Sequence, residues 1–246
     1  MVKYISPTEL LDINKEYIDR QKPLQALLSM ADDHIKGAEV VKSNLKLIKK
    51  IVDKIFLRLS DGGCIIYAGA GTSGRIGVQD GVELFPTFGW PKSRVKFFLA
   101  GGFESLTSSI ENSEDDTEQA LLDFNQDSIS KKDVVFAIAA SGNTPYTCKI
   151  ASLAKNKKAY VVGVLNNPKG NLLKHCNENI VLNTGPEILA GSTRLKAGTS
   201  QKICLNIITT FLMTKLGRVK NGQMSHMVVS NKKLKKRKER INNYPI

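Results

Sequence analysis

The sequence predicts an α/β fold: a doubly wound, mainly parallel sheet of five strands, flanked by helices and preceded by N-terminal helices. Five short apolar runs, each ending in turn-forming residues, occupy positions 64–68, 95–100, 134–140, 159–165 and 179–182. The runs are continuous rather than alternating, and helical segments separate them, which is typical of a parallel sheet covered on both faces. Ligands of such sheets bind at the carboxyl ends of the strands. The loops after the strands are therefore where we expect a site.

Helices are expected at 22–41, 44–59, 117–124, 146–155 and 192–216. The clearest is 44–59, which ends before Asp61-Gly62-Gly63. Its apolar residues recur at steps of three and four and form one amphipathic face: Leu45, Ile48, Val52, Ile55 and Leu59. This face is expected to pack on the sheet.

Composition indicates a cytoplasmic globular protein without a metal or cofactor. Hydrophobic residues make up 41% of the 246 positions and charged residues 24%. The N-terminus has no apolar signal-type region and no apolar run approaches membrane-spanning length, so no membrane association is predicted. The cysteines and histidines show neither disulfide nor metal-ligand spacing: Cys64, Cys148, Cys176, Cys204, His34, His175 and His226.

The net charge of +13 raises the question of a nucleic-acid partner. Much of the excess is local, because residues 231–246 hold seven Lys or Arg and one Glu. Such a run is usually a solvated helix face or a frayed chain end. No aromatic residue interleaves with the basic ones before Tyr244, so base stacking is not supported. We therefore do not predict nucleic-acid binding.

A phosphate-binding loop follows the first predicted strand. Gly71, Thr72 and Ser73 lead from that strand into a helix. Such a loop presents backbone N–H groups and a helix N-terminus to an anion. A tight glycine turn without a ligand is the alternative.

The glycine spacing also fits the G-x-G-x-x-G pattern of dinucleotide folds, but the next strand ends in Gly101-Gly102 without the acidic residue that binds ribose. The Lys of a P-loop is missing as well. Thr72 and Ser73 supply hydroxyls suited to a phosphomonoester, so we favour a sugar phosphate.

Two further loops at strand ends resemble the first. One contains Ser141, Gly142, Asn143 and Thr144, with Pro145 placed for the first helical turn. The other runs from residue 185 to 199 and brings hydroxyls, Arg194 and an ammonium group to a helix start. Three such loops at one sheet edge are predicted to converge on an anion.

Two glutamates are the candidate acid and base. Glu83 is expected just past the helix that follows the first loop, where apolar neighbours would favour its protonated form. A carboxyl group that holds a proton is what a general acid needs. Glu114 lies in an acidic cluster, residues 111–116, whose simpler interpretation is a helix N-cap.

Seven motifs, in this order, resemble the N-acetylmuramic acid 6-phosphate etherase family of the sugar isomerase (SIS) superfamily. They are Gly69-Ala70-Gly71-Thr72-Ser73-Gly74-Arg75, Pro86-Thr87-Phe88-Gly89, Ala100-Gly101-Gly102, Glu114-Asp115, Ala140-Ser141-Gly142, Thr144-Pro145-Tyr146 and the run 191–199. The resemblance extends from about residue 59 to 240. It divides the chain into an N-terminal helical segment (1–58), a SIS domain (59–220) and a basic C-terminal tail (221–246).

The resemblance implies a cytoplasmic, metal-independent homodimer that serves peptidoglycan recycling, with its site near the interface. Its reaction cleaves the D-lactyl ether of N-acetylmuramate 6-phosphate to N-acetylglucosamine 6-phosphate and D-lactate, by elimination and water addition. By motif position, Glu83 protonates the lactate oxygen and Glu114 removes the C2 proton. The implied substrate-binding residues are Gly71, Thr72, Ser73, Ser141, Gly142, Asn143, Thr144 and Arg194.

The chain departs from the family pattern in several places. Val82 and Leu84 flank the first glutamate where family members carry Ser and Cys, and Asn143 replaces an Arg. The segment before residue 59 matches weakly, and the family's C-terminal helical domain is expected to be absent. Two other functions stay open: a non-catalytic sugar-phosphate sensor like glucokinase regulatory protein, and a sugar-phosphate isomerase of the same superfamily.

Overall fold

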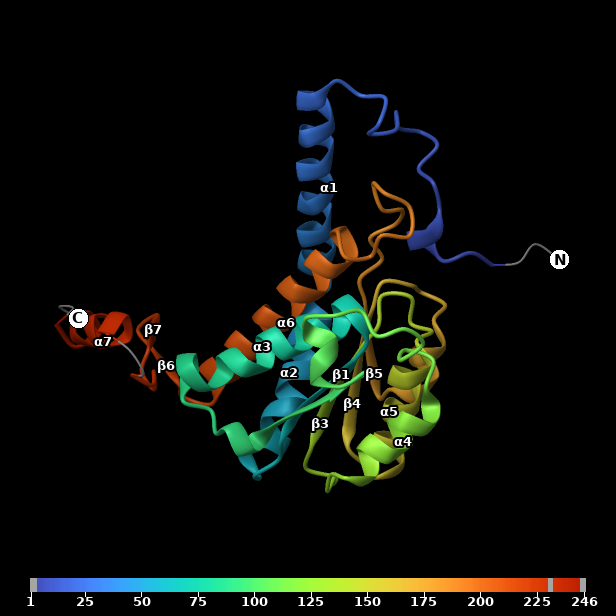
Figure 1. The fold of residues 1–246 in the computed structure, drawn as a ribbon. Coiled ribbons are helices and arrows are strands. Elements are labelled where there is room, and N and C mark those ends of the chain that lie inside the picture. The colour runs from blue at the N-terminus through green and yellow to red at the C-terminus, as the bar shows by residue number, and fades with distance from the viewer. Residues whose placement is uncertain (1–3, 230–231, 244–246) are drawn as a thin grey trace.

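The computed structural model describes residues 4–229 and 232–243. Its centre is a five-stranded parallel sheet with the strand order β2-β1-β3-β4-β5 (Figure 1). The strands are β1 (Ile65–Gly69), β2 (Val95–Leu99), β3 (Val134–Ile138), β4 (Tyr160–Leu165) and β5 (Glu178–Val181). Every strand begins and ends within two residues of its predicted run, so the predicted parallel sheet is confirmed.

Helices cover both faces of the sheet, which makes it doubly wound (Figure 1). One face packs against α2 (Leu45–Ser60), α3 (Gly71–Phe88) and α6 (Lys196–Lys215), and the other against α4 (Thr117–Asn125) and α5 (Pro145–Asn156). Successive strand residues point to opposite faces, so Tyr67 joins the first core and Ala68 the second. The chain changes direction between β1 and β3, the switch point where such sheets bind ligands.

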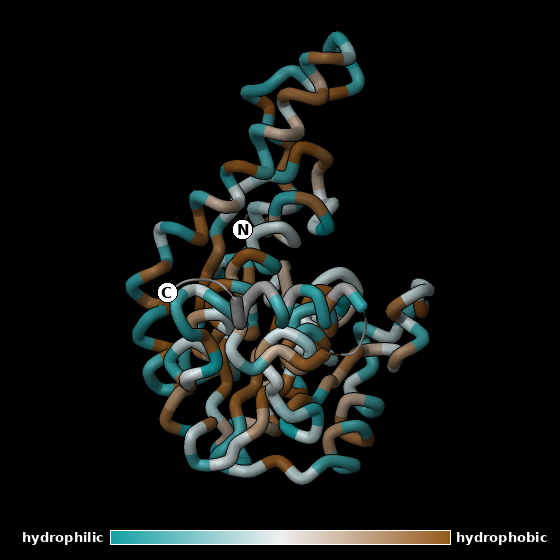
Figure 2. Tube along the Cα trace, turned by 90° about the vertical axis from the view of Figure 1, so that its left-hand side faces the viewer, coloured by the Kyte–Doolittle hydropathy of each residue, from teal (hydrophilic) through white to brown (hydrophobic). Residues whose placement is uncertain are grey.

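The N-terminal helix α1 (Pro23–Ser43) stands out from the body of the molecule (Figures 1 and 2). It approaches the start of α6 closely at Gly37, where a Cβ atom would lie 3.1 Å from the carbonyl oxygen of Lys196. Four apolar side chains of α1 are 50–71% exposed: Leu24, Leu27, Leu28 and Ile35.

The segment before α1 runs back along the loop that precedes α6. It contains the 3₁₀ helix η1 (Pro7–Glu9), and its Thr8 is fully buried. The Gly191 N–H donates a hydrogen bond to the Thr8 carbonyl oxygen at 2.9 Å. The first residues described are therefore fastened beside the carboxyl edge of the sheet. Three more 3₁₀ helices are η2 (Lys92–Arg94), η3 (Phe103–Leu106) and η4 (Asn171–His175).

Two predicted helix boundaries and one predicted core position differ from the structure. The helix after the first loop was expected to end before Glu83, but α3 continues to Phe88 and ends where Gly89 adopts a left-handed conformation (φ +60°). Helix α6 begins at Lys196 rather than 192, because residues 191–195 form turns. In α2, Leu45 is 41% exposed and does not belong to the buried face.

The chain after α6 folds back on the end of α3. The Arg218 guanidinium donates to the carbonyl oxygens of Phe88 and Gly89 at 2.9 Å, and the Val228 N–H donates to that of Pro86. A short hairpin of β6 (Val219–Lys220) and β7 (Gln223–Met224) spans the predicted domain boundary at 220.

Helix α7 (Lys232–Asn243) carries the basic run, and Lys232, Lys235, Lys236 and Lys238 are exposed. Residues 230–231 and 244–246 of the predicted tail lie outside the described residues.

Candidate functional site

The first phosphate-binding loop joins β1 to α3. Residues 70 and 71 lead directly into the helix, and no side chain caps its first turn. The first N–H groups of a helix have no partner within it, so they remain available to an anion. Glycine is required twice here. Gly71 has a φ of +50°, and a Cβ atom on Gly74 would lie 2.9 Å from the backbone carbonyl oxygen of Gly69 as well as 2.3 Å from the Leu99 side chain.

The second loop joins β3 to α5 and lies beside the first, because β1 and β3 are neighbours. Pro145 occupies the first turn of α5 as predicted, and Thr144 is the N-cap residue without a side-chain capping bond. Gly142 has a φ of +66°. Two helix starts with hydroxyl side chains thus lie at one edge of the sheet.

Hydrogen bonds give Ser141 and Asn143 structural partners. The Ser141 hydroxyl accepts a hydrogen bond from the Asn143 N–H at 3.1 Å, and the Asn143 side-chain oxygen accepts one from the Asn171 N–H at 2.9 Å. Asn143 therefore fastens η4 to the loop. The Ser141 hydroxyl proton takes no part in the first of these bonds and stays available for a ligand.

Ser73 is buried in a polar network behind the first loop. Asn166 donates to the backbone carbonyl oxygen of Leu182, which fixes the orientation of its amide group. The Asn166 side-chain oxygen then accepts from Gln201, and Gln201 in turn accepts the Ser73 hydroxyl proton at 2.9 Å. This proton is therefore committed to the network.

The third loop differs from the prediction that it converges on an anion. The carboxylate of Glu187 accepts the N–H groups of Lys196 at 3.0 Å and Ala197 at 2.8 Å, so the chain itself fills the start of α6. The Lys196 ammonium is 3% exposed and donates to Asp33 of α1 at 2.8 Å. Burial raises the pKa of the Glu187 carboxyl above its usual value, against the hydrogen bonds that it accepts. Arg194 is exposed.

The two candidate glutamates are not brought together within one chain. The Glu114 carbonyl oxygen accepts the N–H of Tyr146 in the first turn of α5 at 3.0 Å, so Glu114 lies at the second loop with its side chain exposed. The predicted alternative, an acidic N-cap, belongs to Asp116, which caps α4 by accepting from Gln119 at 2.8 Å.

Glu83 lies near the far end of α3 and is exposed. The prediction that apolar neighbours bury it is wrong for the single chain. Val82 is itself 52% exposed, and Leu84 points into the core on the opposite side of the helix.

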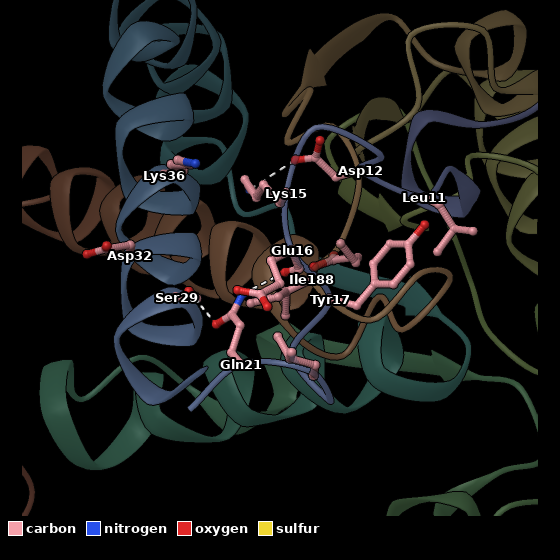
Figure 3. A pocket seen from close by; sticks show the side chains of 12 residues that line it. Leu11, Asp12, Lys15, Glu16, Tyr17, Gln21, Ser29, Asp32, Lys36 and Ile188 are labelled. Atoms are coloured by element: carbon pink, nitrogen blue, oxygen red, sulfur yellow. Dashed lines mark hydrogen bonds and ion pairs between the residues drawn. The ribbon is translucent and has the colours of Figure 1, made fainter. Parts of the chain in front are cut away.

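Two pockets lie near these elements. One, of about 470 Å³, is formed by Gly101, Gly102 and the segment 110–113 next to Glu114, with residues of α4. The other, of about 140 Å³, lies between the N-terminal segment and α1 (Figure 3). Its wall includes the Asp12–Lys15 ion pair at 3.0 Å and the Ser29–Gln21 hydrogen bond at 2.9 Å. It contains no predicted site residue. Within the described residues no cluster could hold a metal ion, and no described helix is long and apolar enough to cross a membrane.

The sequence pattern did not reveal the polar residues that support the site from behind. Asn166 and Gln201 connect α3 to the ends of β4 and β5, and Glu187 with Asp33 fixes the start of α6. Each is a polar residue beside an apolar run, which is a weak signal. Their partners are distant in the sequence, so only the fold reveals the network.

Comparisons with known proteins agree with this fold. Residues 46–155 match the model of the glucokinase regulatory protein N-terminal SIS domain, and residues 103–210 match the SIS domain model. Similar solved structures include the Vibrio vulnificus NanR protein complexed with ManNAc-6P. Its TM-score is 0.54 and its sequence identity is 16%, and the match covers 90% of this chain and 75% of that chain. A phosphoheptose isomerase from Francisella tularensis has a TM-score of 0.54 and 14% identity, covering 79% of this chain and 100% of its own. These similarities concern the fold alone.

Curated relatives are much more similar in sequence. The N-acetylmuramic acid 6-phosphate etherase of Christiangramia forsetii is 43% identical over 90% of this chain and 81% of its own. Those of Mycoplasma mycoides and Deinococcus radiodurans are 38% and 37% identical over 95% and 96% of this chain, each over 78% of its own length. The last alignment covers 237 residues, more than lie between residue 59 and the C-terminus. The similarity therefore extends into the N-terminal segment, which corrects the limit predicted there. The chain belongs to the N-acetylmuramic acid 6-phosphate etherase family.

Proposed function

We propose that this protein cleaves the D-lactyl ether of N-acetylmuramate 6-phosphate in the cytoplasm and releases N-acetylglucosamine 6-phosphate and D-lactate. The observation that carries the proposal is the pair of uncapped helix starts of α3 and α5 beside Glu114, in a chain 37–43% identical to proteins named for this reaction. Four free cysteines suit a reducing compartment.

The phosphate binds at the two helix starts. Thr72, Ser141 and Thr144 supply hydroxyl donors, and the first-turn N–H groups of α3 supply backbone donors from Gly71 onward. Hydrogen bonds to a charged group each contribute about 1.5–3 kcal/mol, and the helix dipoles add to the attraction. Ser73 supports this arrangement from behind through Gln201. Gly142 lets the second loop turn, and the exposed Arg194 is a further cation for the bound sugar.

Elimination needs a base and an acid. In the open-chain sugar the C1 aldehyde acidifies the C2 proton, which Glu114 removes as the C3–oxygen bond breaks. Glu83 gives a proton to the departing lactate oxygen, because an alkoxide is a poor leaving group. Water then adds to C3 of the unsaturated aldehyde, its proton returns to C2, and the product sugar forms. One carboxyl group accepts a proton and the other donates one, the division of roles that acid–base pairs use.

We also propose a homodimer with the site near the interface. The exposed apolar side chains of α1, Leu24, Leu27, Leu28 and Ile35, support it, since such a row on a helix is usually covered in a protein assembly. A single domain also encloses a bound sugar poorly, because Glu114 and Arg194 are exposed and Thr144 is only half-buried.

The test incubates the purified protein with N-acetylmuramate 6-phosphate and measures D-lactate by a coupled assay. We expect equal amounts of D-lactate and N-acetylglucosamine 6-phosphate. In deuterated water, Glu83→Gln retains exchange of the C2 proton but loses lactate release, whereas Glu114→Gln loses both. Loss of a general acid or base costs about 10²–10⁴-fold. A reversed exchange result would mean that the two roles are exchanged.

A second candidate function is a sugar-phosphate-binding regulator, which the match to the glucokinase regulatory protein model favours. Saturable binding of the sugar phosphate, without exchange or lactate release, would establish it. An isomerase would instead convert an aldose phosphate to a ketose phosphate and release no lactate.

A further inference from the structure

The position of Glu83 along α3 decides which sugar it can reach. Helix α3 is continuous from Gly71 to Phe88, with the phosphate-binding loop at its start. Glu83 follows Thr72 by eleven residues, which at 1.5 Å per residue places their backbones about 16 Å apart along the axis. The phosphate binds beyond the N-terminus of the helix, on the side away from Glu83.

That separation exceeds what side chain and substrate span together. With bond lengths like those of the backbone, an extended glutamate reaches about 5 Å from its Cα atom, and about 7 Å separates the phosphorus of the open-chain sugar from its C3 oxygen. Together they fall short of about 16 Å even if both point toward each other. Glu83 therefore cannot touch the ether oxygen of a sugar bound at the start of its own α3.

The surface around Glu83 is suited to a protein partner. Helices α3 and α6 lie side by side in parallel, since Thr72 adjoins Gly198 and Asp80 accepts hydrogen bonds from Asn206 and Thr209. Glu83, three residues beyond Asp80, is therefore level with the C-terminal half of α6. There the outer side of α6 carries an open, mostly apolar groove of about 500 Å³: Ile203, Asn206, Ile207, Thr210, Phe211 and Thr214.

Each of the two helices also exposes an apolar side chain. Val82 on α3 is 52% exposed and Phe211 on α6 is 40% exposed. A carboxylate beside uncovered apolar groups is expected where a second surface closes over them.

We propose that Glu83 protonates the ether oxygen of the sugar bound by a second copy of this chain, so that each site combines Glu114 of one chain with Glu83 of the other. The two copies meet through the outer sides of α3 and α6. In a two-fold dimer whose α3 helices run antiparallel, an axis near the midpoint between Thr72 and Glu83 brings each Glu83 level with the other chain's loop. This inference rests on the proposed function.

The inference is tested by combining two inactive variants in one dimer. Chains carrying Glu83→Gln and Glu114→Gln receive different affinity tags, are co-expressed, and are purified as heterodimers by two successive affinity steps. If Glu83 acts across the interface, one of the two sites holds both intact glutamates, and the heterodimer releases D-lactate at about half the wild-type rate per dimer. If Glu83 acts within its own chain, both sites lack one glutamate and only background activity remains.

A matched control carries the same two changes on one chain. A chain with both Glu83→Gln and Glu114→Gln is paired with a wild-type chain and purified in the same way. If Glu83 acts across the interface, each site of this heterodimer lacks one glutamate, and only background activity is expected. If Glu83 acts within its own chain, the wild-type chain keeps a complete site, which gives about half the wild-type rate. Recovery in the control, with background activity in the first heterodimer, overturns the inference.

The oligomeric state gives a second readout. A wild-type protein that is fully active as a monomer in sedimentation also overturns the inference. Failure of the proposed function is a separate result, because it removes D-lactate release from the wild-type protein itself. Glu83 and Glu114 are both exposed, and exchange of either for the similarly shaped glutamine disturbs no buried contact, so each variant is expected to fold.

Discussion

The starts of α3 and α5 differ from the start of α6, although all three follow strand-end loops of small and hydroxyl residues. The first two have no side-chain cap. In the third, Glu187 caps two N–H groups, and the Lys196 ammonium pairs with Asp33 away from solvent. The carboxylate of Glu187 thus occupies N–H groups at the start of α6 that an anionic ligand would otherwise bind. The first two starts are suited to binding, and the third to holding the fold together.

Mutations at the two kinds of helix start are therefore expected to have different effects. Changes to hydroxyls without an internal partner at the starts of α3 and α5 are expected to alter substrate affinity and leave stability nearly unchanged. Changes around α6 are expected to alter stability, because buried charges there depend on one another.

The largest effect is expected for Lys196→Ala. The substitution leaves the buried Asp33 with only the Lys15 ammonium, 3.9 Å away, in place of its 2.8 Å partner, and removing one partner of a buried ion pair typically costs about 3–5 kcal/mol. Urea unfolding followed by circular dichroism measures the loss. As a control, Lys132→Ala breaks an exposed 3.2 Å pair with Asp61 and is expected to cost less than about 1 kcal/mol. Equal losses in the two variants would show that the Lys196 pair adds no more stability than a surface pair.

Next in size is Thr144→Val. The change removes one hydroxyl donor to the phosphate, and a charge-assisted hydrogen bond is worth about 1.5–3 kcal/mol, or roughly a tenfold to hundredfold rise in KM. Stability should stay nearly the same, because the Thr144 side chain makes no capping bond. Steady-state kinetics measure KM, and the affinity for the unphosphorylated sugar serves as the control. A weakened affinity for both sugars would place Thr144 away from the phosphate.

Most of the sheet could be predicted from the sequence, because buried parallel strands are continuous apolar runs and turn-forming residues mark their ends. The length of α3 could not be predicted in this way. Asp80-Gly81 and Pro86 look like helix breakers, yet Asp80 is bound by Asn206 and Thr209 of α6, and Gly81 allows the ring of Phe97 to pack within 2.5 Å of where its Cβ would be. Contacts from distant elements override local preference there.

For the candidate site, the sequence predicts which residues stand in the loops, and their roles toward a ligand stay predictions. Loop glycines and hydroxyls follow from the motif, since each backbone turn needs them locally. Whether a hydroxyl faces a ligand or the interior depends on partners such as Gln201, which lies 128 residues from Ser73. The exposure of Glu83 was missed for the same reason, because its apolar neighbours in sequence lie on other sides of the helix.

Ser73→Ala tests the residue that connects the start of α3 to α6 through Gln201. The structure predicts a loss of stability, because Gln201 would keep a buried oxygen without its donor, at a cost of about 1–3 kcal/mol. KM for the phosphorylated sugar should change little. Urea unfolding and kinetics on the same preparation separate the two outcomes, and a double-mutant cycle with Gln201→Leu measures the coupling. A raised KM with unchanged stability would instead make Ser73 a phosphate ligand.

The smallest expected effect is a pH dependence of the stability that Glu187 contributes at the start of α6. Burial raises the pKa of Glu187 in the folded protein, so the folded state holds its proton more tightly than the unfolded chain does. Its contribution to stability is thus fully present below the unfolded value of about 4.5 and is lost as pH rises through the folded value. Glu187→Gln cannot titrate and lacks this loss.

The measured quantity is the free energy of unfolding of the wild type minus that of Glu187→Gln, across about pH 4 to 8. The variant is less stable overall, because an amide offers only one acceptor to the two N–H groups that Glu187 binds. We expect the difference to fall as pH rises above about 4.5 and then to level off. A difference that grows with pH would mean that the N–H groups and Lys196 outweigh burial. The start of α6 would then resemble an anion site that the chain occupies with its own carboxylate.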